Sequence, residues 1–133
     1  MIDHLDHLVL TVEDIDATIA FYCDGLGISA ITFGEGRAAL EFGTSKINLH
    51  QVDRTFEPRA ERPTPGSADL CFIAAVPLVD VQRQLAEAGI AIVEGPVVRT
   101  GAQGPINSVY VRDPDGNLVE ISEYVSSQER RIA

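Results

Sequence analysis

The chain has 133 residues, a length that fits one ordinary domain, and its 20 acidic and 10 basic residues give a formal net charge of −10. This acidic balance argues against nucleic acid as the main partner, because phosphate binding needs clustered lysine and arginine, and against docking on an anionic membrane surface. No apolar run approaches the roughly 18 residues of a membrane-spanning helix, and the N-terminus lacks a signal-peptide pattern. We therefore expect a cytoplasmic protein.

The first half of the chain predicts a strand, a helix and three further strands. Asp14 is a plausible N-cap, and Ile15, Ile19 and Tyr22 form an apolar stripe at helical spacing before Gly25 and Gly27 end the helix. The strands are expected at residues 5–12, 28–33, 38–42 and 46–52, the last two as a hairpin.

Residues 53–67 hold three prolines, two glutamates and three arginines without periodicity, so we interpret this stretch as a linker. The second half then repeats the first: a strand at 68–75, a helix that starts at Pro77 and ends at Gly89, and three more strands. These strands are expected at residues 90–93, 106–112 and 117–123, with 97–103 as loop or strand. The single domain of residues 1–133 thus divides into module one (4–53), a linker (54–67), module two (68–125) and a polar tail (126–133).

A shift of 62 positions places His7 on Asp69 and Gly27 on Gly89 and superimposes the strand, helix and glycine pattern of the two halves without a gap. This internal repeat predicts an α+β fold of two β-α-β-β-β modules whose sheets cover each other's apolar faces. Sheets of this size are marginally stable alone, so we also expect pairing of modules and of chains.

Four chemically reactive side chains lie within predicted strands: His7, His50, Asp69 and Glu120. A buried polar or charged side chain needs a partner, and one shared divalent cation would satisfy all four. Imidazole and carboxylate ligands suit Zn²⁺, Ni²⁺, Co²⁺, Fe²⁺ or Mn²⁺. Each residue also has an explanation without a metal: His7 bonded to a backbone carbonyl, Glu120 paired with an arginine, His50 at the surface, and Asp69 at a strand start.

Three sequence segments carry a resemblance to a known family. They are the first strand with Asp6-His7, the helix exit from Ile19 to Gly27, and Asp113-Pro114-Asp115-Gly116-Asn117 with Glu120 four residues after the glycine. Together these segments resemble the vicinal oxygen chelate superfamily of glyoxalase I, bleomycin resistance proteins, fosfomycin-modifying enzymes and extradiol dioxygenases. Residues 62–73 and 94–118 resemble more narrowly the glyoxalase-domain-containing protein 5 type.

The resemblance implies a curved mixed-sheet fold around a metal and substrate cavity, a homodimer, and metal ligands on the first and last strands of each module. His7 and Glu120 match these ligands by residue type. Asp69 stands where a histidine is usual. Asn48 stands where Glu or Gln is found in some members, and His50, two residues on, faces the same way. We therefore expect His7, His50, Asp69 and Glu120 as metal ligands, with Glu120 also the catalytic base.

Further residues are candidates for binding a small-molecule substrate. The resemblance points to Tyr110 and Asn107, and Asn48 is the third candidate. Simple hairpin pairing places Tyr110 opposite Val119, away from Glu120, unless a bulge reverses it. Arg37, Arg54 and Arg99 could meet an anionic substrate, but we interpret each as a solvated surface side chain.

The leading functional hypothesis is a metal-dependent lyase or isomerase of the glyoxalase I kind, which removes a C–H proton from a substrate chelated through neighbouring oxygens. The main alternative is a metal-free protein that sequesters a ligand as bleomycin resistance proteins do. A small Fe²⁺ dioxygenase and a fosfomycin-type thiol transferase are further alternatives.

Overall fold

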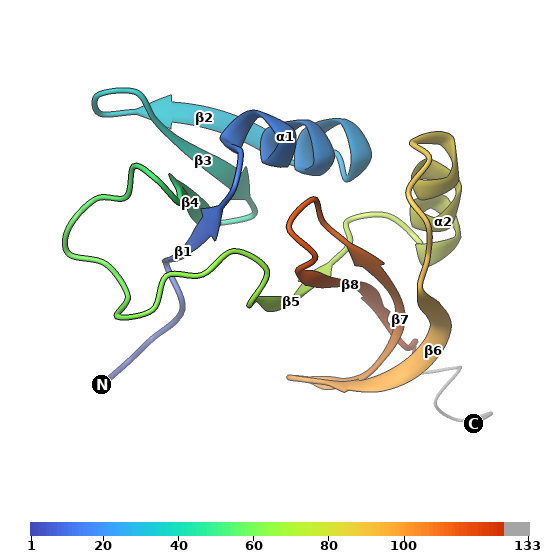
Figure 1. The fold of residues 1–133 in the computed structure, drawn as a ribbon. Coiled ribbons are helices and arrows are strands. Elements are labelled where there is room, and N and C mark those ends of the chain that lie inside the picture. The colour runs from blue at the N-terminus through green and yellow to red at the C-terminus, as the bar shows by residue number, and fades with distance from the viewer. Residues whose placement is uncertain (127–133) are drawn as a thin grey trace. The chain divides into compact units, whose positions relative to one another are not determined.

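The computed structural model describes residues 1–126, and Figure 1 shows its elements. Residues 127–133, most of the expected polar tail, lie outside this part of the chain. The elements are β1 (His7–Val12), α1 (Ile15–Ala20), the π-helical turn η1 (Phe21–Gly25), β2 (Ser29–Phe33), β3 (Arg37–Phe42), β4 (Ser45–Gln51), β5 (Asp69–Ile73), α2 (Leu78–Glu87), β6 (Glu94–Gly101), β7 (Gly104–Arg112) and β8 (Leu118–Tyr124).

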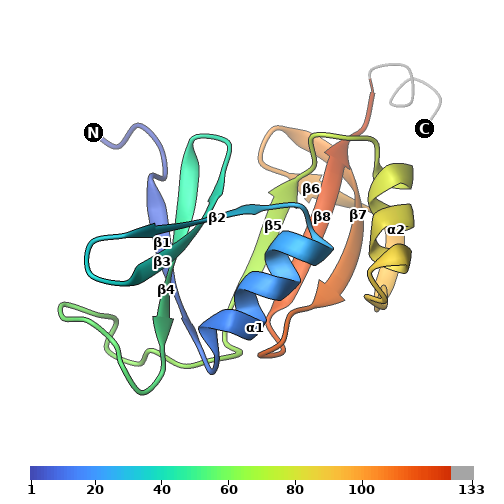
Figure 2. The same cartoon turned by 90° about the horizontal axis from the view of Figure 1, so that it is seen from above.

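The predicted repeat and the α+β fold are confirmed. One four-stranded sheet has the order β1-β4-β3-β2 and the other the order β5-β8-β7-β6, so each strand has the same place in its own sheet (Figure 2). In both sheets the first strand runs parallel to the last and the remaining pairs are antiparallel.

The chain forms two compact units. The first contains Met1–Ala68 together with Asp113–Asn117, and the second contains Asp69–Arg112 and the residues from Leu118 onward. The segment after β4 has no helix or strand in residues 52–68, and Arg54 in this segment forms an isolated bridge with Gln51.

In the first unit the alternation of apolar residues decides which face of the sheet is buried. Leu10 and Val12 on β1 and Ile47 and Leu49 on β4 are all 5% exposed or less. Asp14 caps α1 as predicted, since its side chain accepts a hydrogen bond from the backbone N–H of Asp16. Helix α1 contacts β4, so it lies against the sheet of its own unit.

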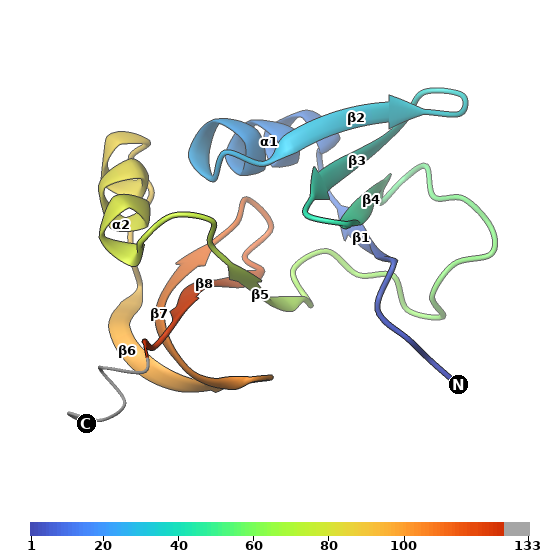
Figure 3. The same ribbon diagram turned by 180° about the vertical axis from the view of Figure 1, so that it is seen from behind.

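In the second unit, α2 presents Leu78, Val81 and Leu85 to the sheet, as the helical spacing predicts. The helix begins after Pro77, and it contacts β7 and β8 (Figure 3). The carboxylate of Glu123 on β8 accepts a 2.9 Å hydrogen bond from the backbone N–H of Leu78, one of the donors that a helix start leaves unpaired.

The strand expected at residues 90–93 is not formed. Ile90 still closes the helix by donating its N–H to the carbonyl oxygen of Leu85, and strand β6 begins only at Glu94. The register of β6 on β7 then shifts between Glu94 and Val97. The apolar run at 90–93 is therefore a connection, and the stretch expected as loop or strand is the true partner of β7.

The expected register of the last hairpin is also wrong. Tyr110 lies opposite Glu120, and Val111 lies opposite Val119, so the pairing is displaced by one residue from the simple expectation. The cause is the turn: the Asp113 carboxylate accepts hydrogen bonds from the backbone N–H groups of Asp115 and Asn117, which keeps Asn117 in the turn and starts β8 at Leu118. A one-residue slip moves every side chain to the other face, so Tyr110 shares a face with Glu120.

None of the helices in residues 1–126 is long and apolar enough to cross a membrane.

Candidate functional site

His7, Asn48 and His50 lie on one face of the first sheet, as the strand alternation predicts. The parallel register places His7 opposite Lys46, Val9 opposite Asn48, and Thr11 opposite His50. His7 and Asn48 are thus diagonal neighbours, two residues apart along adjacent strands. His50 is four residues along the strand from His7, or about 13 Å, which side chains standing perpendicular to a sheet do not span. The first unit therefore pairs His7 with Asn48 and leaves His50 apart.

His7 has the local geometry of a metal-binding histidine. Its Nδ1 lies 2.8 Å from Oδ2 of Asp6, and this carboxylate is the acceptor, so Nδ1 carries the proton. The hydrogen bond from His7 is the main reason why the pKa of Asp6 lies below its ordinary value. The remaining ring nitrogen, Nε2, keeps its lone pair. Metal-binding histidines commonly have this arrangement, in which one ring nitrogen donates a hydrogen bond to a carboxylate and the other nitrogen is left for the metal.

Asn48 and His50 are polar side chains inside the sheet. Asn48 is 6% exposed and His50 is 3% exposed, so the surface position considered for His50 is wrong. Oδ1 of Asn48 and both ring nitrogens of His50 have no hydrogen-bond partner in residues 1–126. Burial, with a smaller effect from Arg37, lowers the pKa of His50, so the ring is neutral at neutral pH. Buried groups of this kind are costly unless something binds them.

Asp69 and Glu120 form the equivalent pair in the second unit. Asp69 lies opposite Leu118, and Cys71 lies opposite Glu120, so Asp69 and Glu120 are also diagonal neighbours two residues apart on adjacent parallel strands. Asp69 is exposed and Glu120 is half-buried. Each unit thus presents one diagonal pair at the same register position, His7 with Asn48 and Asp69 with Glu120.

The Glu120 carboxylate is held by two serines rather than by the arginine considered from the sequence. The hydroxyl of Ser108 donates a 2.6 Å hydrogen bond to Oε2 of Glu120, and the hydroxyl of Ser122 lies 2.6 Å from that of Ser108. Both serines are fully buried. The hydroxyl of Ser122 lies 3.5 Å from Sγ of Cys71, an exposed thiol on the same face. The sequence analysis missed the role of Ser122, because serine in a strand carries no distinctive signal.

Tyr110 also faces Glu120, but Asn107 does not. Asn107 lies opposite Glu123 on the alternate residues of β7, with Val109 and Val111, so it lies on the other face of the sheet from Glu120. The hydroxyl of Tyr110 accepts a 3.1 Å hydrogen bond from Nε of Arg99, and Arg99 in turn pairs with Glu94 at 3.0 Å. Burial raises the pKa of Tyr110, and the Glu120 charge adds to this effect against the opposing Arg99, so the phenol is neutral at neutral pH.

These donors suit a divalent cation by their chemistry. The first unit offers an imidazole nitrogen and an unpartnered amide oxygen, and the second unit offers two carboxylates. Each of these is a group that Zn²⁺ and other first-row divalent ions accept as a ligand. In residues 1–126 no group of three or more His, Cys, Asp or Glu side chains is close enough together to hold a metal ion. Within that range, each unit by itself thus supplies fewer than three such side chains at one place.

Comparison with known proteins places this chain in one family. The model of the Glyoxalase/Bleomycin resistance protein/Dioxygenase superfamily matches residues 4–121. The chain is 64% identical over 125 residues to virulence protein STM3117 of Salmonella typhimurium, covering 94% of this chain and 87% of the relative. It is 60% identical over 120 residues to the glyoxalase domain-containing protein RDO1 of Mycosarcoma maydis, covering 90% of this chain and 68% of the relative.

Solved structures agree with this assignment. The crystal structure of the Salmonella virulence protein matches with a TM-score of 0.92, covering 94% of this chain and 99% of that one. Lactoylglutathione lyase from Agrobacterium tumefaciens, 23% identical, matches with a TM-score of 0.70 over 92% of this chain and 95% of its own, which shows a shared fold. From its sequence match and its paired β-α-β-β-β sheets, the chain belongs to the glyoxalase/bleomycin resistance protein/dioxygenase superfamily, the vicinal oxygen chelate fold.

Proposed function

We propose that this protein is a metal-dependent enzyme of the glyoxalase I kind, a lyase or isomerase that moves a proton on a small substrate with neighbouring oxygen atoms. The observation that carries the proposal is the pair of diagonal donors at the same register position in both units, His7 with Asn48 and Asp69 with Glu120. Chance placement of polar residues would not repeat in this way, and a protein that only sequesters an apolar ligand has no use for them.

Each residue has a distinct role in this proposal. The metal ligands in this proposal are His7, Asn48, Asp69 and Glu120. Asn48 takes the place of His50, which the sequence pointed to, because the sheet register puts Asn48 and not His50 next to His7. A bound divalent ion would act as a Lewis acid on the substrate's oxygens. Glu120 acts as the general base, and the hydrogen bond from Ser108 fixes its orientation. Tyr110, on the same face and protonated, contacts the substrate.

Metal binding gives the first test. Protein stripped of metal with a chelator is titrated with Ni²⁺, Zn²⁺, Co²⁺, Mn²⁺ or anaerobic Fe²⁺ by calorimetry and by thermal unfolding. We expect at least one ion to bind and raise the Tm. His7→Ala should weaken that affinity more than tenfold. His4→Ala is the matched control, since His4 pairs with Asp3 as His7 does with Asp6 but lies before β1.

Catalysis gives the second test. The metal-loaded protein is assayed with the adduct of methylglyoxal and a thiol, and Glu120→Gln should lower kcat by about 10²-fold or more while the far-UV spectrum persists. The proposal is overturned if no ion binds, or if His7→Ala and His4→Ala bind metal equally. Tight binding of a bleomycin-like cation by the metal-free protein would instead support the sequestering alternative.

The expected homodimer is part of the same proposal. Each unit contains only four strands, and sheets of this size gain stability from pairing. Light scattering on the purified protein should give twice the 14.3 kDa mass of the chain, and a mass of one chain at micromolar concentration would contradict the dimer.

A further inference from the structure

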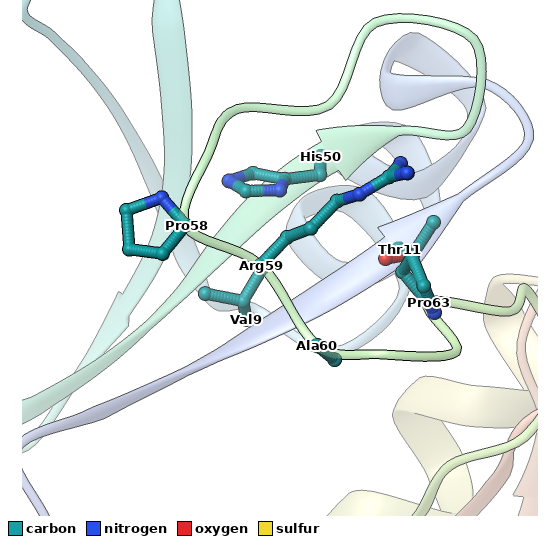
Figure 4. A pocket seen from close by; sticks show the side chains of 7 residues that line it. All are labelled: Val9, Thr11, His50, Pro58, Arg59, Ala60 and Pro63. Carbon is teal, nitrogen blue, oxygen red and sulfur yellow. The ribbon is translucent and has the colours of Figure 1, made fainter.

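A pocket of about 270 Å³ lies within the first unit, over β1 and β4 and beneath the segment that follows β4. Figure 4 shows His50 projecting from β4 and Arg59 projecting from the segment that crosses the sheet. The pocket is lined by Val9, Thr11, His50, Pro58, Arg59, Ala60 and Pro63.

His50 is the polar group that the pocket leaves without a partner. The side chain is 3% exposed, it lines the pocket, and neither ring nitrogen has a hydrogen-bond partner in the described chain. An imidazole that is buried loses its hydrogen bonds to water, and this loss is unfavourable unless other hydrogen bonds replace them. Buried polar groups in folded proteins are therefore nearly always paired. A ligand with a polar end that reaches His50 would supply the missing hydrogen bond.

The charge around His50 is positive, although the whole chain carries −10. Arg59 is the one charged residue that lines the pocket, and no acidic side chain lines it. Its guanidinium is positioned by Glu57, at 3.1 Å from Nε, and by Thr55, which accepts a 2.7 Å hydrogen bond from Nη1. Glu57 is largely exposed, so water screens its charge.

Arg37 adds a second positive charge. Ala39 lies opposite Asn48 in the register of β3 on β4, so Arg37 and His50, each two residues further along its strand, lie on that same face. Its guanidinium stacks over the rings of Phe33 and Phe56, each 4.8 Å from the ring centroid, and Phe56 contacts the His50 ring edge-on at 5.4 Å. Arg37 does not itself line the pocket, but none of the ion pairs in residues 1–126 neutralises it, so its positive charge acts on His50 from beside the pocket.

The remaining lining is apolar. Val9, Pro58, Ala60 and Pro63 contribute hydrocarbon surface, and the volume accommodates a molecule of a few heavy atoms. The combination of a short apolar wall with a polar, positively charged end matches a small organic acid better than inorganic phosphate, which has no hydrocarbon part to bury.

We propose that this pocket binds the carboxylate end of a small organic acid, with the N–H of His50 and the charges of Arg37 and Arg59 facing the carboxylate. The pocket lies on the sheet face that also carries Asn48. A further consequence, which rests on the proposed metal-dependent function, is that the substrate itself carries a carboxylate.

The test is binding to metal-free protein, measured by calorimetry and by the NMR signals of the His50 ring in the presence of a chelator. Butyrate should bind and shift these signals. Butyramide, the neutral molecule of the same shape, and inorganic phosphate should each bind at least tenfold more weakly. Equal binding of butyrate and butyramide, or tighter binding of phosphate, would overturn the proposal.

Three variants assign the binding to these residues. His50→Gln and Arg37→Gln should each weaken butyrate binding about tenfold or more, and Arg59→Gln should weaken it without affecting the buried sheet. Arg54→Gln is the matched control, because Arg54 pairs with Asp53 in the same segment but does not line the pocket. If His50→Gln fails to fold, Arg59→Gln decides alone: unchanged affinity there overturns the proposal.

These outcomes are separate from those of the proposed function. If butyrate binds as expected and no metal ion binds, the acid-binding pocket is supported and the proposed metal-dependent activity is rejected. If a metal ion binds and butyrate does not, the proposed metal-dependent activity is still supported and the acid-binding pocket is rejected.

Discussion

At the scale of single residues, the feature that most constrains the first unit is the buried carboxylate of Asp113. It accepts four hydrogen bonds, from the hydroxyl of Tyr22 at 2.8 Å, the side-chain amide of Asn117 at 2.8 Å, and the backbone N–H groups of Asp115 and Asn117 at 2.9 Å. A carboxylate that is 5% exposed is tolerated only because these donors replace its water. The Asp-Pro-Asp-Gly-Asn sequence thus has a structural role, and the chemistry belongs to other residues.

Tyr22→Phe tests this network. The variant removes one donor from a buried charge that keeps its other three, so we expect a loss of about 1.5–3 kcal/mol in the free energy of unfolding, measured with urea. Tyr124→Phe is the control, since the hydroxyl of Tyr124 accepts one exposed 3.2 Å hydrogen bond from the backbone of Gln103. Its loss should stay below about 1 kcal/mol, and equal losses in the two variants would contradict the role given to Asp113.

At the scale of elements, the helices are fixed by periodicity and the strands by pairing. Helix α2 illustrates the first case, because its apolar stripe, its start at Pro77 and its end near Gly89 are all readable from neighbouring residues. Strand β6 illustrates the second. The apolar run at residues 90–93 has strand-like composition, yet strand β6 begins only at Glu94.

One leucine and one valine on α2 distinguish the effect of burial from the effect of helix formation. Leu85 is 1% exposed, so Leu85→Ala should cost about 2–5 kcal/mol in the free energy of unfolding through lost apolar burial and a cavity. Val79, on the same helix, is 65% exposed, and Val79→Ala should change the stability by less than about 0.5 kcal/mol. Thermal and urea unfolding of both variants check the difference, and similar losses would mean that α2 does not pack as described.

At the scale of the whole molecule, the two units are not two consecutive pieces of chain. The turn Asp113–Asn117 connects β7 to β8 of the second unit but belongs to the first. There it provides the acceptors for three distant donors: Tyr22, the backbone N–H of Glu13 through Asp115, and the backbone N–H of Ala68 through Asn117. The first unit is therefore incomplete without this turn from the second half of the chain.

A fragment of residues 1–68 should consequently fail to fold, although it contains all four strands and the helix of the first unit. Far-UV circular dichroism and NMR of this fragment should show an unfolded chain at 25 °C. A chain in which a Gly/Ser linker joins residue 68 to residues 111–119 restores the missing acceptors and should regain dispersed NMR signals. A cooperatively folded 1–68 fragment would show that the turn is dispensable.

The sequence by itself determined the repeat, most of the element order, the alternation within each strand and the family, because each depends on local alternation, helical spacing and glycine positions. It also singled out His7, Asn48, His50, Asp69 and Glu120. It could not choose among them, since their grouping depends on the register between strands about 40–50 residues apart. The tertiary structure decided that Asn48 and not His50 neighbours His7, because the pairing of β1 on β4 fixes the distance along the sheet.

The structure also decided which residues share a face with Glu120. The side-chain hydrogen bonds of Asp113 lengthen the last turn by one residue, which brings Tyr110 and Ser108 beside Glu120 and turns Asn107 away. The sequence could not show that the His50 ring is buried without a hydrogen-bond partner. That depends on the segment after β4, which covers the ring in the folded chain.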